Sequence, residues 1–585
     1  MTGLRRRVPA RQWAGRGLGW LGSAVRWLEA LAGSWRGAVV LFVVALADFV
    51  VQALAWPLAA GKNLDTYLLG YIQLFDRHPL LPWAPLFRGP GVGVVVGPML
   101  DVAGGALAEP GAAVLFALSV VAWSVTARYF GPRVAIVVAV ALLLYPGYGA
   151  VFHELASEIV EATVFSLWAL AATRAAMLPS VGRFLLAGVG VAALVLIRPG
   201  NAVIVPFALF PLLLSGVWRE RLGWAAAFAG AACLPLVAWT LQNGWRYGDY
   251  TLARGGNTVV PFYRTFTLDK IVSPSNGPAS RRLAAAIQQR LLARDPFKDY
   301  HVTLDQVFST GSNRVLAELY ILSDQLWGWS SAYSTLRDVA VEAIQAHPGT
   351  YASSVADTIW QQLSTPTYTT IAPVVRSRQA SVPASAHAAA PDPGELIPVG
   401  DKVWISRPDQ SIRQVWTSAT TSKFVFLEPT QKPRFDQIVQ DLNRLDHNFP
   451  HRAGNRQLQR RLNQLAHRYP PPIFWLALGL VALPIRRPRG TKTLALLTGA
   501  ALTTVVFNAL GVAANPRYML PFAPAFVLFG AAALLGSRSP RNPATGPTDG
   551  VGKTAHARDD ETGGGTPAGG PSDGGPVLRA DASRP

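Results

Sequence analysis

Asp65 is the residue of this sequence best placed to act as a proton acceptor. It stands in the segment Lys62-Asn-Leu-Asp-Thr-Tyr67, directly after the first long apolar run of the chain. A carboxylate near a membrane surface loses part of its hydration, which raises its basicity. Such a group can take the proton of an attacking hydroxyl. The alternative is an ordinary solvated loop residue, and this segment alone does not decide between the two.

Further polar groups fall at the boundaries of other apolar runs. Glu154 and Glu158 are four residues apart and share one helical face, and Glu161 lies nearly one turn deeper, where an ionisable group is costly. Arginines at such boundaries can hold phosphate oxygens with paired hydrogen bonds. The alternatives are ion pairs that join helices, or arginines that snorkel to the surface. The candidates for substrate or carrier-phosphate binding are Arg88, His153, Glu154, Glu158, Arg198, Asn201, Arg517 and Tyr518.

The composition indicates a polytopic membrane protein. Of 585 residues, 50% are hydrophobic and only 15% are charged, and the apolar residues cluster in runs near the length that crosses a bilayer. A net charge of +19 would ordinarily suggest a nucleic-acid-binding protein. Membrane orientation and contact with anionic lipids explain the charge better, so we expect membrane lipids and no nucleic acid as partners.

Ten apolar runs are predicted to span the membrane, with nine to twelve possible. Loops rich in Arg and Lys alternate with loops that carry the candidate site residues, which places the basic loops and both termini in the cytoplasm and the site outside the cell membrane. The predicted spans are 37–59, 111–130, 133–152, 157–176, 183–197, 200–217, 222–241, 471–485, 493–514 and 520–536.

The fold class is therefore an all-α polytopic membrane protein with a large, mostly helical extracytoplasmic domain. Periodicity predicts helices in 280–294 and 336–362, whereas 375–393 is rich in Ala, Ser and Pro. Within loop 60–110 we expect surface helices. The predicted parts are a basic amphipathic segment 1–36, a transmembrane module 37–241 with that external loop, the external domain 242–470, a second transmembrane module 471–536 and a disordered tail 537–585.

Several of these elements occur in the order seen in GT-C-class glycosyltransferases. The chain resembles bacterial relatives of the dolichyl-phosphate-mannose protein mannosyltransferases over about 37–270 and 471–536. The elements that carry the resemblance are Lys62–Tyr71, Arg88-Gly-Pro90, Gly104-Gly105, Ala156-Ser-Glu158, Val195–Asn201 and Pro516–Pro521.

The resemblance implies an inverting transferase that takes a hexosyl or pentosyl group from a polyprenyl-phosphate carrier. Asp65 matches the catalytic acid of the first external loop, and Arg198 and Arg517 match arginines near carrier phosphate. The acceptor would be an envelope glycan, lipid or protein. Family members often carry paired acids in this loop, but Thr66 follows Asp65 here. We therefore favour a metal-independent reaction over one that uses a divalent metal, and we expect no other cofactor.

Two other readings stay open. A transporter or flippase of lipid-linked or envelope solutes could use the same acids as coupling sites, and Asp48 and Glu161 favour it. The gathering of polar groups at one surface and the single large external domain speak against it. A non-catalytic envelope scaffold would have no cavity between Asp65 and Arg517.

Overall fold

The chain is described here from a computed structural model. Its described residues are 29–76, 79–81, 83–366, 402–407, 410–416, 422–447, 449, 452–511 and 515–537. Three sequence predictions fall outside these ranges: the amphipathic segment 1–36 apart from residues 29–36, the Ala/Ser/Pro-rich stretch 375–393, and the tail 537–585 apart from its first residue.

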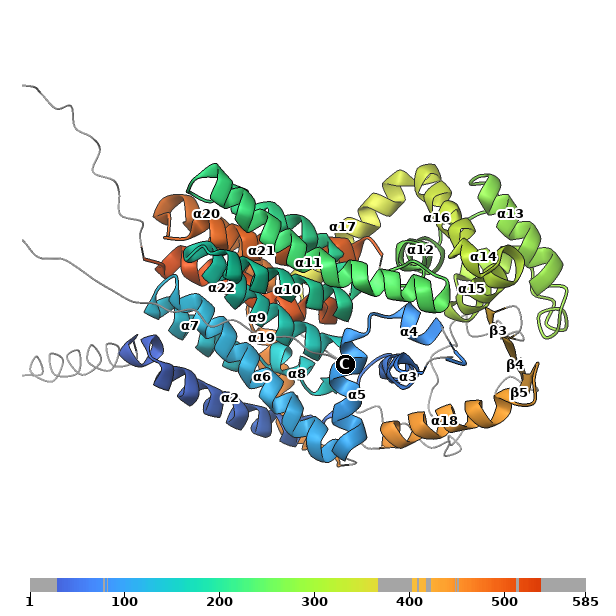
Figure 1. The fold of residues 1–585 in the computed structure, drawn as a ribbon, viewed down its shortest axis with the longest axis horizontal. Coiled ribbons are helices and arrows are strands. Elements are labelled where there is room, and N and C mark those ends of the chain that lie inside the picture. The colour runs from blue at the N-terminus through green and yellow to red at the C-terminus, as the bar shows by residue number, and fades with distance from the viewer. Residues whose placement is uncertain are drawn as a thin grey trace, which may run out of the picture. The chain divides into compact units, whose positions relative to one another are not determined.

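The described chain is almost entirely helical, as the sequence predicts (Figure 1). The first half contains α2 (Trp35–Ala55), β1 (Ala59–Ala60), α3 (Leu64–Leu74), α4 (Trp83–Phe87), α5 (Gly91–Ala103), α6 (Gly105–Arg128), α7 (Pro132–Leu143), α8 (Pro146–Val151), β2 (Glu154–Leu155), α9 (Ser157–Met177), α10 (Val181–Ile197), the 3₁₀ helix η1 (Pro199–Leu213) and α11 (Trp218–Tyr247).

The second half begins with helices that lie outside the apolar bundle, which we call the external helices for that reason, and returns to the bundle at its end. Its elements are α12 (Gly256–Tyr263), η2 (Arg264–Leu268), α13 (Pro278–Ala286), η3 (Ile287–Leu291), α14 (Leu304–Thr310), α15 (Asn313–Trp327), η4 (Trp329–Ser331), α16 (Ser334–Ala346), α17 (Pro348–Ser364), β3 (Lys402–Arg407), β4 (Gln410–Trp416), β5 (Ser422–Phe426), α18 (Gln431–His447), α19 (Arg456–Arg468), α20 (Pro472–Arg486), α21 (Thr491–Ala509), η6 (Pro516–Tyr518), η7 (Leu520–Phe522) and α22 (Ala523–Leu535).

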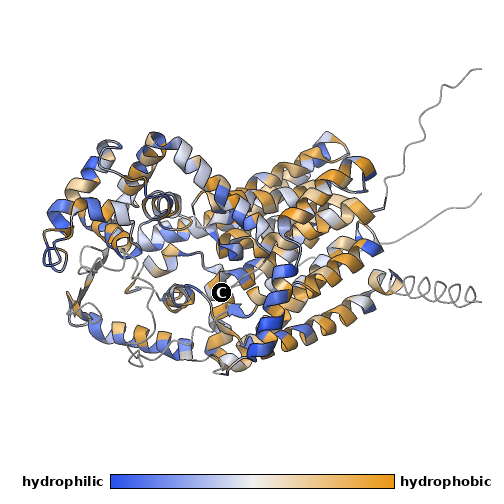
Figure 2. Cartoon of the chain, turned by 180° about the vertical axis from the view of Figure 1, so that it is seen from behind, coloured by the Kyte–Doolittle hydropathy of each residue, from blue (hydrophilic) through white to orange (hydrophobic). Residues whose placement is uncertain are grey.

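Six segments within the described ranges are long and apolar enough to cross a membrane. Figure 2 shows the bundle helices as predominantly hydrophobic and the external helices as mixed or hydrophilic. Shorter apolar helices cover 91–103, 132–143, 181–197 and 199–213. The six long segments are 35–55, 105–128, 157–177, 218–247, 491–509 and 516–535.

Each of the ten predicted spans coincides with helical structure, but several bounds differ. The predicted span 133–152 is two helices, α7 and α8, because the chain breaks before Pro146, and proline cannot continue the backbone hydrogen bonding of a helix. Helix α6 begins at Gly105 instead of 111, directly after Gly104, which adopts a positive φ of 55° and ends α5.

The basic loops meet at one end of the bundle. The backbone of Ser537, after α22, bonds to Phe130 after α6 and to Arg489 before α21. Gly490 lies against Met177 at the end of α9. Helix α9 has 21 residues, so its two ends are about 30 Å apart, close to the thickness of a bilayer core. Its first residues, Ser157 and Glu158, therefore lie at the opposite end from these loops.

The external helices have their own hydrophobic core and are tied to the bundle by Arg264. This buried guanidinium pairs with Asp269 at 3.0 Å and donates to the carbonyl of Ala509, at the end of α21. It also donates to Ser354 on α17. The predicted helix 336–362 is interrupted by Pro348, which begins α17. The three-stranded antiparallel sheet β3-β4-β5 is an addition to the mostly helical domain that the sequence predicts.

Candidate functional site

A two-residue parallel strand pair brings the segment before Asp65 against the segment before Glu158. Ala59 of β1 pairs with Glu154 of β2, and the N–H of Gly61 donates to the carbonyl of Leu155 at 3.1 Å. A Cβ atom on Gly61 would lie 2.6 Å from the Cβ of Ala156, so only glycine allows the two chains to come this close. Helices α3 and α9 therefore begin beside each other.

Helix α3 presents Asp65 to solvent because its other face is buried. Asn63 precedes the helix in a left-handed conformation, with φ of 65°, which asparagine tolerates better than most residues. Leu64, Tyr67 and Leu68 recur at helical spacing and are buried. Asp65 lies in the first turn between them and is exposed. Within the described ranges, its carboxylate has no hydrogen-bond or ion-pair partner.

The acids of α9 are held by Arg198, at the junction between α10 and η1. Its Nη1 lies 2.6 Å from Glu161, and its Nη2 lies 2.7 Å from Glu158. Nη2 also donates to the hydroxyl of Ser157 at 3.0 Å. Asn201 donates to the second oxygen of Glu161 at 2.8 Å. Charged groups buried in this way are stable only when they are paired and hydrogen-bonded.

Arg517 completes this ion cluster from the other end of the chain. Its Nε lies 3.4 Å from Glu158, and the ring of Tyr518 lies about 5 Å from both guanidinium groups, at 4.9 Å from that of Arg517 and 5.0 Å from that of Arg198. Burial acts to lower the pKa of Arg198, but the two acids, with Tyr67 and Tyr518, raise it overall. We define the ion cluster as Glu158, Glu161, Arg198 and Arg517: two carboxylates matched by two guanidiniums.

Arg88 lies beside the ion cluster but is not neutralised by it. Its guanidinium stacks 5.2 Å from the ring of Tyr67 and 5.3 Å from that of Phe87. The following residue, Gly89, packs against the backbone of Leu196, two residues before Arg198. The Nε of Arg88 is buried without a hydrogen-bond partner. No carboxylate in the described part of the chain pairs with this arginine.

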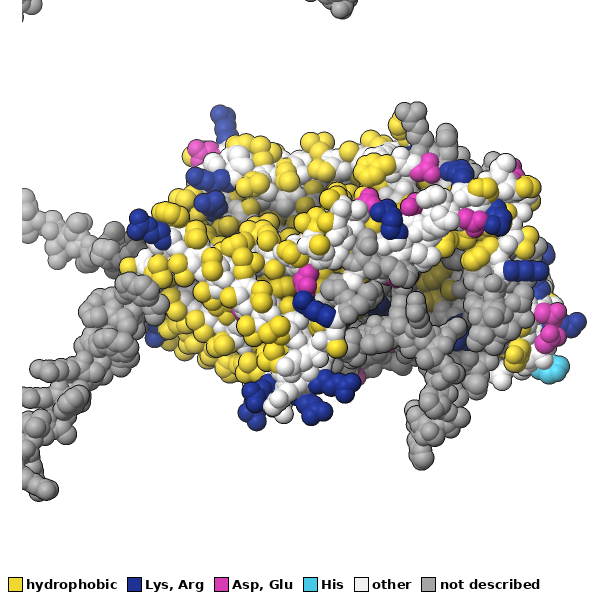
Figure 3. Space-filling view, turned by 90° about the horizontal axis from the view of Figure 1, so that it is seen from below, with side chains coloured by type: hydrophobic (Ala, Val, Ile, Leu, Met, Phe, Trp, Pro, Cys, Tyr) yellow, Lys and Arg dark blue, Asp and Glu magenta, His cyan; other side chains and the backbone are white. Residues whose placement is uncertain are grey.

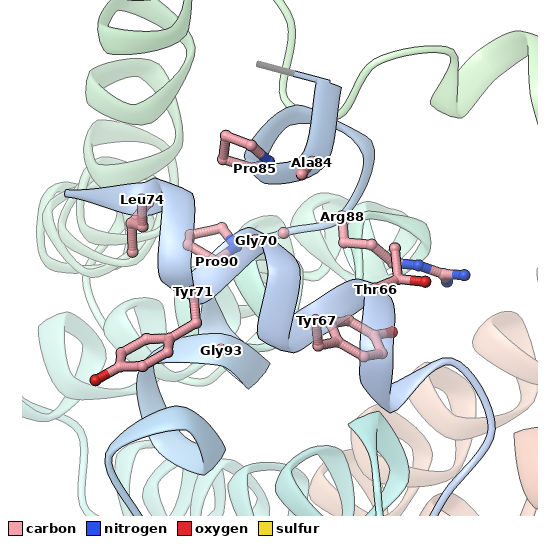
Figure 4. A pocket seen from close by; sticks show the side chains of 11 residues that line it. Thr66, Tyr67, Gly70, Tyr71, Leu74, Ala84, Pro85, Arg88, Pro90 and Gly93 are labelled. Atoms are coloured by element: carbon pink, nitrogen blue, oxygen red, sulfur yellow. The ribbon is translucent and has the colours of Figure 1, made fainter. Parts of the chain in front are cut away.

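A small open pocket connects Arg88 with the start of α3. Thr66 and Tyr67 line it together with Arg88, and Gly70, Tyr71 and Leu74 continue its wall along α3. Figure 4 shows Arg88 beside Thr66 at one end of the pocket, with Tyr71 and Leu74 at the other. Asp65 is the residue before Thr66, in the first turn of α3, and does not itself line the pocket.

The structure brings most of the predicted site residues close together, but some of them are buried and contact other protein groups. His153 has no exposed surface and stacks on Phe49 with ring centroids 4.2 Å apart. Asn201 is also fully buried and bonds to Glu161. These two side chains cannot touch a substrate in this conformation, so packing and support of the ion cluster replace the predicted contact. Glu154 lies in β2, where its backbone pairs with Ala59.

The roles of Arg198, Glu158 and Arg517 in substrate or carrier-phosphate binding stay predictions. Their charged groups are occupied by one another, as in the alternative interpretation of helix-joining ion pairs. Sequence reasoning missed Tyr67, which touches Arg88 and lies near Arg198. The signal was present, because Tyr67 follows Asp65 by two residues within the same motif.

Metal ligands are not gathered in the described part of the chain, where no group of three or more His, Cys, Asp or Glu side chains could hold an ion. The metal-independent reaction expected from the sequence stays a prediction.

No protein-family model matches the chain, and no curated protein matches it. The solved structures that are similar to it include the following two. One is the archaeal oligosaccharyltransferase AglB from Archaeoglobus fulgidus, in complex with an inhibitory peptide and a dolichol-phosphate. It has 13% sequence identity and a TM-score of 0.35, and the match covers 86% of this chain and 50% of AglB. The chain thus spans about half the length of that protein.

A second similar structure is ArnT from Cupriavidus metallidurans, bound to undecaprenyl phosphate. It has 13% identity and a TM-score of 0.29, and the match covers 85% of this chain and 78% of ArnT. At these scores the likeness is distant, and the chemistry of the site has to be judged from the residues of this chain.

Proposed function

We propose that this chain is a membrane glycosyltransferase that moves a sugar from a polyprenyl-phosphate carrier to an extracytoplasmic hydroxyl, with inversion. Two groups without an ionic partner among the described residues carry the proposal. Arg88 lines the pocket, and the exposed Asp65 directly precedes Thr66 of the pocket lining. A base for the acceptor and a cation for the leaving phosphate are the two groups that this reaction needs.

In the proposed reaction, Asp65 takes the proton of the acceptor hydroxyl as that oxygen forms a bond to the anomeric carbon. The bond from this carbon to the carrier phosphate breaks with its electron pair. The polyprenyl phosphate leaves with additional negative charge. Arg88, which has no carboxylate partner among the described residues, stabilises that charge, and the rings of Tyr67 and Phe87 hold its guanidinium in place.

The proposal changes the task assigned to Arg198 and Arg517. The sequence favours them as phosphate ligands, but their contacts with Glu158 and Glu161 leave little net positive charge for an incoming anion. We assign them instead to holding the start of α9, and hence the adjoining β2–β1 pair, in register with α3. Neither Arg198 nor Arg517 determines which sugar or which acceptor is used.

The direct test is Asp65→Asn in the full-length protein, reconstituted with polyprenyl-phosphate sugar and a membrane-extract acceptor. We expect transfer to fall by about 10²-fold or more, since a general base contributes on that scale. The melting temperature should stay unchanged because Asp65 is exposed and unpaired. Asp305→Asn is the matched control, since Asp305 is also an exposed first-turn acid, on α14. Full activity of the Asp65 variant would reject the proposed base.

The transporter alternative predicts a different result for the same protein. Sealed vesicles would accumulate labelled carrier or solute without any glycosyl product. Detection of glycosyl product from wild-type protein, and of none from the Asp65 variant, excludes that alternative.

A further inference from the structure

Helix α19 carries an unusual density of unpaired positive charge. Its sequence, Arg-Gln-Leu-Gln-Arg-Arg-Leu-Asn-Gln-Leu-Ala-His-Arg, contains no acid. Its arginine side chains are exposed and have no ion-pair or hydrogen-bond partner among the described residues. They are Arg456, Arg460, Arg461 and Arg468. Like charges held along one helix repel each other, so a fold that keeps them together favours a negatively charged partner.

The opposite side of α19 fixes the helix to the bundle. Leu458 and Leu462, four residues apart, pack against Ala55, Trp56 and Ala150. The backbone N–H of Asn455, the N-cap, donates to the carbonyl of Leu54 at 2.7 Å. The charged side is thus held in one orientation by contacts at the end of α2.

Both neighbours of α19 place it at the boundary of the apolar bundle. Helix α2, the most hydropathic of the candidate spans, ends at Ala55. At the other end of α19, Tyr469 stacks on Tyr145 with centroids 3.9 Å apart, and α20 begins at Pro472. The helix therefore lies where α2 ends and α20 starts, which is the level of lipid headgroups when these helices cross a bilayer.

The surface next to this level is suited to lipid tails. Val50, Val51 and Leu54 of α2 and Phe474 of α20 are 48–58% exposed. Figure 3 shows a broad hydrophobic area on the molecule with Lys and Arg side chains at its margins. A soluble partner would leave this apolar surface uncovered, whereas a phospholipid covers it with its tails while its phosphate reaches the arginines.

We propose that α19 is a binding surface for anionic phospholipid headgroups. Arg456, Arg460 and Arg461 share the turn and a half nearest the end of α2, and they hold the phosphates. Leu465, which is 44% exposed, inserts beside the acyl chains. The inference is independent of the transfer reaction, because none of these residues lines the pocket next to Asp65.

The test uses the purified full-length protein in a neutral detergent and compares added phosphatidylglycerol with phosphatidylcholine. We expect phosphatidylglycerol to raise the melting temperature by several degrees more than phosphatidylcholine. The triple variant R456Q/R460Q/R461Q should lose most of that difference. Native mass spectrometry should show correspondingly fewer retained phosphatidylglycerol molecules.

Two further variants show whether the loss is specific. The control R282Q/R290Q/R294Q removes three exposed arginines from the external helices and should keep the full difference. The variant R456K/R460K/R461K keeps the charge and should retain most of the difference, which excludes a mere folding defect. An unchanged lipid difference in R456Q/R460Q/R461Q would overturn the proposal. An equal shift with inorganic phosphate or with a nucleic-acid oligomer would overturn it as well.

Discussion

The ion cluster and the pair Asp65 and Arg88 use the same residue types in opposite ways. In the ion cluster, Glu158 and Glu161 are buried and matched by Arg198 and Arg517 at distances of 2.6 to 3.4 Å. In the first turn of α3, Asp65 is exposed, and no partner for it lies in the described ranges. The role of an acid next to a membrane boundary can therefore be inferred only once its partners are known. Matched charges hold helices together, whereas unmatched charges are available for a substrate.

The largest effect is expected from breaking the ion cluster at Arg198. Arg198→Met leaves Glu158 and Glu161 buried with a single remaining guanidinium, which should destabilise the fold by about 3–5 kcal/mol. Thermal unfolding in detergent measures the loss. The double variant E161Q/R198M removes the unmatched acid, leaves Glu158 with Arg517, and should regain part of the stability. If Arg198→Met lowered activity without changing stability, the cluster would belong to the reaction and the comparison would fail.

The converse experiment removes the unmatched cation. Arg88→Gln should reduce kcat/KM by about 10- to 100-fold, the range expected for losing hydrogen bonds to a charged group. Its melting temperature should stay near that of the wild type, because no ion pair is broken among the described residues. Arg88→Lys keeps the charge and should recover part of the rate. A large loss of stability in Arg88→Gln would show that Arg88 stabilises the fold, as the arginines of the ion cluster do.

His153 is fully buried and has no ionic partner among the residues that the structure describes. Burial, assisted by the charge of Arg452, lowers the pKa of His153 to about 3. The unfolded chain takes up this proton near pH 6.5. The unfolded state therefore binds more protons between pH 6.5 and 3, and stability falls as the pH drops through that window. His153→Phe should reduce the difference in melting temperature between pH 7 and pH 5, and an unchanged difference would contradict this account.

The smallest effect is expected at Glu342, a matched charge far from the pocket. Its carboxylate accepts hydrogen bonds from the N–H groups of Ala279 and Ser280, each at 2.8 Å, at the start of α13. These bonds lower its pKa, overcoming its slight burial, so its contribution to stability is present above its ordinary pKa and is lost in acid. Glu342→Gln should cost about 1 kcal/mol, as for the loss of a helix cap, and leave kcat/KM unchanged.

The sequence predicts the elements of this fold well because apolar run length and loop charge are local signals. Every predicted span coincides with helical structure, and the basic loops meet at one end. The break before Pro146 was readable from the proline itself. Strands β3 to β5 were not, since a short sheet is defined by pairing between segments and not by a strong local period.

The sequence could predict which residues lie close together at the site. It could not predict which of them are paired with each other. Asp65, Arg88, Arg198 and Arg517 all lie at one end of the bundle, as loop alternation requires. Which arginine is neutralised depends on how deep α9 places Glu161 relative to Arg198, and that depth is set by tertiary packing. The burial of His153 has the same origin, because its ring is covered by Phe49 from a helix a hundred residues earlier.

The pairing of β1 with β2 has a consequence for how this chain tolerates changes in length. Only four residues, 61–64, separate the last paired residue, Ala60, from Asp65. Gly61 lies where this segment comes closest to Leu155 and Ala156, and Asn63 adopts the left-handed conformation. The backbone of this stretch is therefore tightly constrained. Adding one residue inside the first turn of α3 would rotate the acid by about 100° about the helix axis. Insertions here should reduce the transfer activity as much as removal of the Asp65 carboxylate does.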